Sequence, residues 1–257
     1  MRYTRQNRLV GEHGFTLVEM LVIAPIALLI IAGFIALMVN MTGDVLATQQ
    51  RSGQIYNTED ALDEIQHDVR LSSGFASSVA ATSPQGANND ASTWTATAGG
   101  KTLLISTFGT TNTSNVSNSL VYQSTPNSCS SGSYIYNPPY IVYIVYFIAP
   151  SSDGSSNALW RRTILSPGTT CSNGTLVQRA SCAYGATING SPCQTHDEEV
   201  LDGVTNASFT YYVNPGDTTP VSDPTTAGTV DASLTTTSNV AGKTFTYTAD
   251  LRGTSIN

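Results

Sequence analysis

The chain has 257 residues, of which 11% are charged, and its formal net charge is −7. This length suffices for one domain with an additional segment, or for two small domains, and it can bury a sizeable core without a metal. The only lysines are Lys101 and Lys243, and no basic patch follows Arg8. Direct nucleic-acid binding is therefore disfavoured, because it depends on clustered Lys and Arg side chains.

Residues 1–14 form a basic leader with three arginines and one glutamate. The run from Met20 to Val39 then carries no charge, and at 1.5 Å per residue it is long enough to cross a hydrocarbon layer of roughly 30 Å. The positive residues precede this run and acidic residues follow it, beginning with Asp44. We therefore expect a single-pass helix in the cytoplasmic membrane, with a cytoplasmic N-terminus and an exported C-terminal part.

Two other interpretations of the apolar run remain open. A buried core helix would need apolar surroundings, which the rest of this polar chain hardly offers. A cleaved signal peptide would have an apolar region of only about 7–15 residues, followed by a site of the A-x-A type. Neither feature of a signal peptide is present in the segment around residues 15–50.

The helical pattern continues beyond the apolar run. Ile55, Leu62, Ile65 and Val69 recur at helical spacing, and polar residues such as His67 occupy the other faces. We therefore expect a transmembrane helix over residues 15–41 and an amphipathic continuation over residues 42–74. Pro25, the Thr42-Gly43 pair and Gly53 are the positions at which this helix could bend.

Residues 75–257 are rich in Ser, Thr, Asn and Gly, and their apolar runs are β-branched or aromatic. We expect an α+β fold in which the long helix packs on an exported domain with an antiparallel β-sheet. The run 140–149, YIVYIVYFIA, is apolar on both faces and predicts a central strand that the helix covers on one side. The other predicted strands are 102–108, 119–124, 158–165, 207–213, 232–238 and 243–252; the predicted loops are 77–100, 151–157 and 214–228.

All four cysteines, Cys129, Cys171, Cys182 and Cys193, lie in the β-rich part. Export would favour disulfides, and four cysteines allow three connectivities, among which the sequence does not choose. Our expectation is pairing between neighbours, Cys129 with Cys171 and Cys182 with Cys193. The alternative is a zinc site built from Cys193, His196, Cys171 and Cys182, although structural zinc sites usually use close ligand pairs on both sides.

Motifs of enzymes are missing from the sequence. It has no GxSxG, HExxH, Walker or GxGxxG pattern and only three histidines, so we expect a non-enzymatic protein without a cofactor. The acidic stretch His196–Asp202 could bind calcium. However, it lacks the alternating oxygen ligands of a calcium loop, which favours a solvated loop that leads into a strand.

The residues HGFTLVEMLV, His13 to Val22, resemble the N-terminal motif of type IV pilins and pseudopilins. The resemblance implies that a prepilin peptidase cleaves between Gly14 and Phe15 and methylates the new amine of Phe15. Glu19 then becomes the fifth residue of the mature chain. The position of Pro25 departs from the family pattern, in which the proline comes later.

A weaker likeness covers LDEIQHDVRLSSGF, VLDGVTNASFTYYV and FTYTADLRG, which are similar to segments of larger minor pilins and J-type minor pseudopilins. By this resemblance the chain is a subunit of a type IV pilus or of a related secretion or competence filament. Its partners would be other pilin subunits, the prepilin peptidase, an inner-membrane assembly platform and, before assembly, the lipid bilayer. The alternative is a membrane-anchored surface protein that binds a ligand through its β-rich domain.

Glu19 is a charged residue that directly precedes the uncharged run Met20–Val39. A carboxylate in lipid costs a few kcal/mol at mid-bilayer and is usually kept for a partner. The resemblance implies that Glu19 pairs with the Phe15 amine of a neighbouring subunit and thereby sets the axial register of the two helices. Pairing with the amine of its own chain is the alternative.

Overall fold

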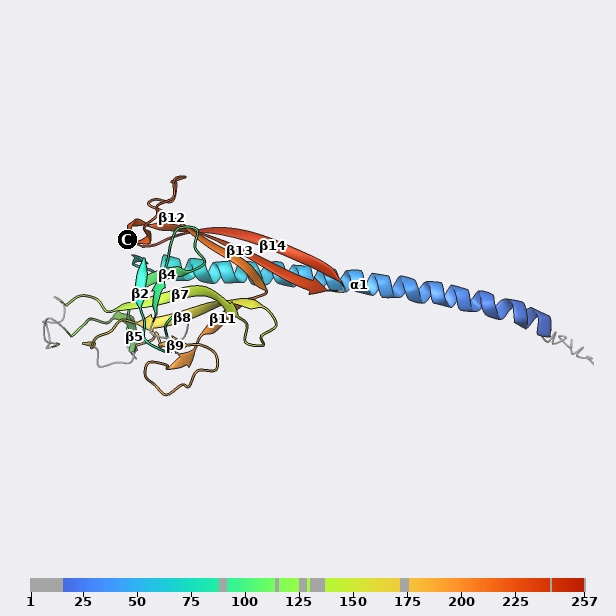
Figure 1. Ribbon diagram of the computed structural model, residues 1–257, viewed down its shortest axis with the longest axis horizontal. Helices are drawn as coiled ribbons and strands as arrows, with labels where there is room; N and C mark the ends of the chain where they lie inside the picture. The colour runs from blue at the N-terminus through green and yellow to red at the C-terminus, as the bar shows by residue number, and fades with distance from the viewer. Residues whose placement is uncertain are drawn as a thin grey trace, which may run out of the picture. The chain divides into compact units, whose positions relative to one another are not determined.

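The computed structural model describes residues 16–87, 92–113, 116–124, 129, 137–171, 176–240 and 242–256. The chain forms two compact units, Met1–Gln49 and Gln50–Asn257. Helix α1 (Leu17–Arg70) is continuous over 54 residues (Figure 1). The expected single long helix is therefore confirmed for its described part, and neither Gly43 nor Gly53 interrupts it.

The second half of α1 packs on the β-sheets through most of the apolar residues that were predicted at helical spacing. Leu62, Ile65 and Val69 are buried, and His67 on the opposite side is exposed. Ile55 is only half-buried, and the buried residues in this part of the helix are Gln54 and Thr58. Both face strand β13, where Gln54 Nε2 donates to Thr236 Oγ1 at 2.8 Å. Toward the N-terminal side of this contact, the helix therefore binds β13 through hydrogen bonds of polar side chains instead of apolar packing.

A five-stranded antiparallel sheet has the order β1-β4-β7-β8-β11. Strand β7 lies in the centre, which confirms the prediction made from its two apolar faces. Tyr146 of this strand is fully buried and bonds to Asp68 of α1, so the helix covers β7 as expected. The strands are β1 (Gly74–Phe75), β4 (Leu103–Phe108), β7 (Ile141–Pro150), β8 (Asn157–Leu165) and β11 (Glu198–Asp202).

A second antiparallel sheet contains β12 (Val204–Tyr212), β13 (Thr229–Val240) and β14 (Lys243–Thr254). The prediction of one sheet was thus too simple. The chain passes from β11 to β12 at Gly203, which has a φ of +71°. A Cβ at this position would come within 3.0 Å of the Thr237 carbonyl oxygen, so the close approach requires glycine. The loop before β13 contains the short 3-10 helix η2 (Pro224–Thr226).

Three strand pairs complete the described β structure: β2 (Ser78–Ala80) with β3 (Thr93–Thr95), β5 (Thr110–Thr113) with β6 (Val116–Leu120), and β9 (Ser181–Cys182) with β10 (Thr195–His196). The predicted loop 77–100 thus contains two strands, and the predicted strand 119–124 is displaced toward its N-terminal side. The β9–β10 pair is parallel, a departure from the antiparallel expectation. The connection between them, residues 183–194, is long enough for the crossover that parallel strands require, and the Cys182–Cys193 disulfide closes this connection.

One hydrophobic core joins the helix to both large sheets. Its buried side chains come from α1, from β4 and β7 of the first sheet, and from β12 and β13 of the second. They include Leu62, Ile65, Val69, Leu103, Ile105, Val145, Phe209, Tyr211, Val230 and Leu234. This burial makes the end of α1 an integral part of the β-rich unit and confirms the α+β architecture.

Candidate functional site

The first candidate site is the apolar segment of α1, residues 17–41. A stretch of 18 residues in this helix has a mean hydropathy of 2.9, and no part of this stretch is buried inside the protein. A core helix of a soluble protein would be mostly buried, so that interpretation is not supported. Burying one large apolar side chain contributes about 1.5–3 kcal/mol, and more than ten of them are exposed here. The segment fits a single-pass membrane anchor.

Glu19 caps the start of this helix. Its Oε2 accepts hydrogen bonds from the backbone N–H and the hydroxyl of Thr16, each at 2.9 Å, and its own N–H donates to Thr16 Oγ1 at 3.3 Å. This reciprocal pattern is a capping box, which satisfies backbone donors that the first helical turn leaves without partners. Glu19 therefore has a local structural role in addition to any role in assembly.

The predicted processing site, Gly14 and Phe15, lies outside the described residues, as does the leader 1–14. Cleavage and N-methylation stay predictions. Phe15 directly precedes Thr16 in the sequence, so a new amine there would be one residue away from a hydrogen-bond donor to Glu19.

The four cysteines form two disulfides, Cys129–Cys171 and Cys182–Cys193. This is the expected neighbour pairing, and it leaves none of the four sulfurs free for the alternative zinc site. His196, the fourth proposed zinc ligand, is exposed and lies beside the ring of Tyr184, with 5.9 Å between ring centroids. Two disulfides fit an exported domain.

In the acidic stretch His196–Asp202, His196 ends β10 and Glu198–Asp202 form β11, with the buried Asp197 between them, so the stretch is not the solvated loop that was expected. All four of its carboxylates bind partners in the protein, and Glu199 Oε2 accepts a hydrogen bond from the Ser152 N–H at 3.0 Å. Asp197 pairs with Arg162, Glu198 lies 3.7 Å from Arg161, and Asp202 accepts a hydrogen bond from Ser156. The described residues contain no group of three or more His, Cys, Asp or Glu side chains that could hold a metal ion.

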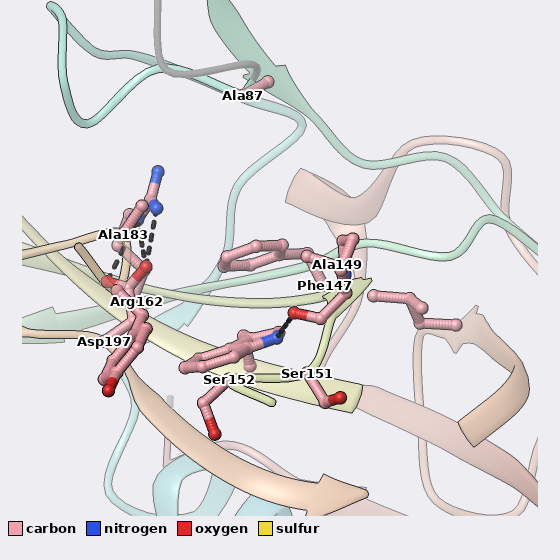
Figure 2. A pocket seen from close by; sticks show the side chains of 12 residues that line it. Ala87, Phe147, Ala149, Ser151, Ser152, Arg162, Ala183 and Asp197 are labelled. Carbon is pink, nitrogen blue, oxygen red and sulfur yellow. Dashed lines mark hydrogen bonds and ion pairs between the residues drawn. The ribbon is translucent and has the colours of Figure 1, made fainter. Parts of the chain in front are cut away.

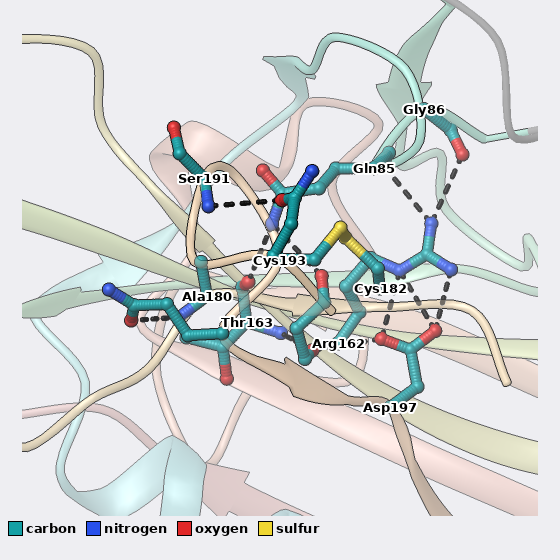
Figure 3. The surroundings of a disulfide bond; sticks show 12 residues. Gln85, Gly86, Arg162, Thr163, Ala180, Cys182, Ser191, Cys193 and Asp197 are labelled. Atoms are coloured by element: carbon teal, nitrogen blue, oxygen red, sulfur yellow. Dashed lines mark hydrogen bonds and ion pairs between the residues drawn. A yellow bond between two sulfur atoms is a disulfide. The ribbon is translucent and has the colours of Figure 1, made fainter. Parts of the chain in front are cut away.

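Arg162 and Asp197 form a buried ion pair beside the Cys182–Cys193 disulfide (Figure 3). Their side chains are 2% and 1% exposed, and Arg162 Nη2 lies 2.5 Å from Asp197 Oδ2. The guanidinium also donates to the carbonyls of Gln85 and Gly86, at 3.1 Å each, and Asp197 accepts from the Ser181 hydroxyl at 2.8 Å. Both buried charges are thus paired and hydrogen-bonded. The contacts connect β8, β9 and the segment before β3.

A groove of about 560 Å³ lies next to this pair (Figure 2). Its wall is formed by the end of β7 and the following turn, by β8, and by the disulfide loop. Figure 2 shows Arg162 and Asp197 on one side of the groove and Phe147 and Ala149 on the other. The lining is completed by Ala87, Ile148, Pro150, Ser151, Ser152, Trp160, Ala183 and Tyr184.

A second charged cluster connects α1 to the five-stranded sheet. Arg161 Nε lies 2.7 Å from Asp68 Oδ2 and 3.5 Å from Glu64 Oε1, and Arg161 Nη1 lies 3.7 Å from Glu198 Oε2. Burial raises the pKa of Glu64 to about 7, and the negative charges of Glu198 and Asp68 add to this effect, which Arg161 opposes. Tyr146 donates to Asp68 at 2.7 Å, and burial of its phenol raises its pKa well above the ordinary value.

No family model, no curated protein and no solved structure matches this chain. A single long apolar N-terminal helix, continued into a disulfide-bonded β-rich domain, is compatible with the architecture of pilins.

Proposed function

We propose that the chain is a structural, non-enzymatic subunit of a type IV pilus or of a related secretion or competence filament. A prepilin peptidase removes residues 1–14 and methylates the amine of Phe15. The mature protein first resides in the cytoplasmic membrane and then enters an extracellular or periplasmic filament. The observation that supports this proposal most directly is the motif HGFTLVEMLV at the start of a helix whose apolar N-terminal segment is not buried in the protein.

The exposed apolar surface of such a subunit must be shielded from water both before and after assembly. In the membrane, lipid covers the apolar segment. In a filament, the same segments of neighbouring subunits cover one another, so the apolar area remains shielded from water. The size of the chain, well above that of the smallest pilins, and its long polar loops favour a minor subunit over the major one.

Glu19 has two tasks in this proposal. Within a subunit its Oε2 caps the helix through Thr16. Between subunits its carboxylate neutralises the N-terminal amine of a neighbouring Phe15, which fixes the axial register where water is scarce. A wrong axial register would leave the carboxylate and the amine unpaired in apolar surroundings, where an unpaired charge is costly. The correct register is therefore favoured.

Sheared filaments probed by immunoblot test this proposal. We expect the wild-type subunit in the filament fraction. Glu19→Ala should leave membrane insertion intact and remove the subunit from that fraction. Because Glu19→Ala also removes the helix cap, Thr16→Ala serves as the matched control: it disrupts the capping box and keeps the carboxylate.

The two variants separate register from capping. Glu19→Ala should abolish incorporation, whereas Thr16→Ala should reduce it only slightly. Equal loss in both variants would assign the effect to the cap alone. Normal incorporation of Glu19→Ala would contradict the register role. Absence of the wild-type protein from the filament fraction would favour the membrane-anchored surface protein.

A further inference from the structure

The groove beside the Arg162–Asp197 pair has the size of a small-ligand site. Pockets for such ligands usually enclose about 300–1,000 Å³, and this one encloses about 560 Å³. All of its described lining residues belong to the β-rich unit.

The charges in the groove are already neutralised. Among the described residues that line the groove, only Arg162 and Asp197 are charged, and they bind each other. Their remaining contacts, with Gln85, Gly86 and Ser181, are also inside the protein. A phosphate, a carboxylate or a cation would therefore find no counter-charge here, and the matching ligand is uncharged.

Aromatic side chains supply the apolar surface of the groove. Tyr184 is 64% exposed and stands in the loop that the Cys182–Cys193 disulfide closes. Phe147 packs against the ring of Trp94, at a centroid distance of 4.7 Å, and the guanidinium of Arg162 contacts both rings, at 5.1 Å from Phe147 and 5.3 Å from Trp94. Trp160 is fixed by its bond to the Pro150 carbonyl, at 3.1 Å. Because Phe147 and Trp160 are already held in place, ligand binding orders little structure beyond Tyr184.

Hydroxyl groups border the aromatic surface. Among the described residues, no hydrogen-bond partner is found for the hydroxyls of Ser152 and Tyr184, and both residues are exposed. A purely apolar ligand would remove these hydroxyls from water without replacing the lost hydrogen bonds. A pyranose ring avoids this loss, because it has an apolar C–H face for the tyrosine and hydroxyls along its edge.

We propose that this groove binds a neutral pyranose unit of a glycan, with Tyr184 as the stacking surface and Ser152 as a hydrogen-bonding group at its rim. The binding involves no covalent step. The fixed rings and the disulfide-closed loop make the site largely preformed, and its single exposed ring implies weak affinity for one sugar unit, with a Kd of roughly 0.1–1 mM.

The test is saturation-transfer NMR on the full chain in a zwitterionic detergent without a sugar head group. The probes are the neutral trisaccharides cellotriose, maltotriose and triacetylchitotriose, with the acidic trisaccharide trigalacturonate for comparison. We expect saturation transfer to at least one neutral probe, strongest at ring C–H protons, and at least tenfold weaker binding of trigalacturonate. Fluorescence of Trp160 should change over the same concentration range.

Variants complete the test. Tyr184→Ala should weaken binding about tenfold or more, and Tyr184→Phe, which keeps the ring, should weaken it much less. Tyr56→Ala is the matched control, because Tyr56 is 71% exposed on α1 outside the groove. The proposal is overturned if no neutral probe shows transfer at about 10 mM. It is also overturned if trigalacturonate binds as well as the neutral probes, or if Tyr184→Ala and Tyr56→Ala behave alike.

Discussion

Arg161 of β8 holds Asp68 of α1 through two hydrogen bonds, from Nε to Oδ2 at 2.7 Å and from Nη2 to Oδ1 at 3.2 Å. Asp68 also accepts the hydroxyl proton of Tyr146, so one helical carboxylate binds two strands of the same sheet. This contact fixes the helix on the β-rich unit at a position where the sequence shows only an amphipathic pattern.

Replacing Asp68 should destabilise the β-rich unit. Asp68→Ala leaves the hydroxyl of Tyr146 without its acceptor and Arg161 without its closest carboxylate, which we expect to cost about 2 kcal/mol. Asp63→Ala is the control, because Asp63 is exposed on the same helix. Urea unfolding of the full chain in detergent measures both. A change below about 0.5 kcal/mol for Asp68→Ala would show that the pair contributes no net stability.

Glu64 predicts a pH dependence of stability. Its pKa is raised from the ordinary 4.5 to about 7 in the folded protein, so the folded state binds this proton more tightly than the unfolded state does. Its contribution to stability is therefore fully present below about pH 4.5 and is lost as the pH rises through about 7. Because its side chain is 35% exposed, solvent screening reduces the size of the effect.

The measurement is the melting temperature between pH 4.5 and 8, for the wild type and for Glu64→Gln. Other groups titrate in both proteins, so the difference between the two curves isolates Glu64. We expect the wild type to lose stability relative to Glu64→Gln as the pH rises, with most of the change between about pH 4.5 and 7 and little further change above that range. Parallel curves would contradict the raised pKa.

Two buried tyrosines of β-strands should respond in opposite ways to loss of the hydroxyl. Within the described part of the chain, the Tyr211 hydroxyl is buried without a hydrogen-bond partner, whereas Tyr146 donates to Asp68. Tyr146→Phe should cost about 1–2 kcal/mol, and Tyr211→Phe should be neutral or stabilising by up to about 1 kcal/mol. Unfolding by urea provides both values. Equal destabilisation by the two substitutions would reveal a partner for Tyr211.

Local sequence patterns predicted the elements that carry long, regular signals. Helix α1 and strands β4, β7, β8, β12, β13 and β14 overlap their expected ranges, because each presents an apolar run at a helical or strand period. Short strands were missed. For example, β2 and β3 have three residues each and are defined by pairing across the core, Val79 opposite Trp94, which no local pattern reveals.

The two ion pairs could not be predicted from local patterns. Arg161 and Arg162 are adjacent in the sequence, yet one binds Asp68, 93 residues away, and the other binds Asp197, 35 residues away. Pairs of such separation depend on the sheet order. The capping box, by contrast, was visible as Thr16-Leu17-Val18-Glu19, which fits the S/T-x-x-E pattern.

The central claim is that the chain is processed like a pilin and assembled into a filament. Mass spectrometry of the subunit recovered from sheared filaments and from membranes tests it most directly. The account predicts that residues 1–14 are absent and that the chain begins with N-methylated Phe15. A filament subunit that retains its leader, or one that begins at another residue, would contradict it.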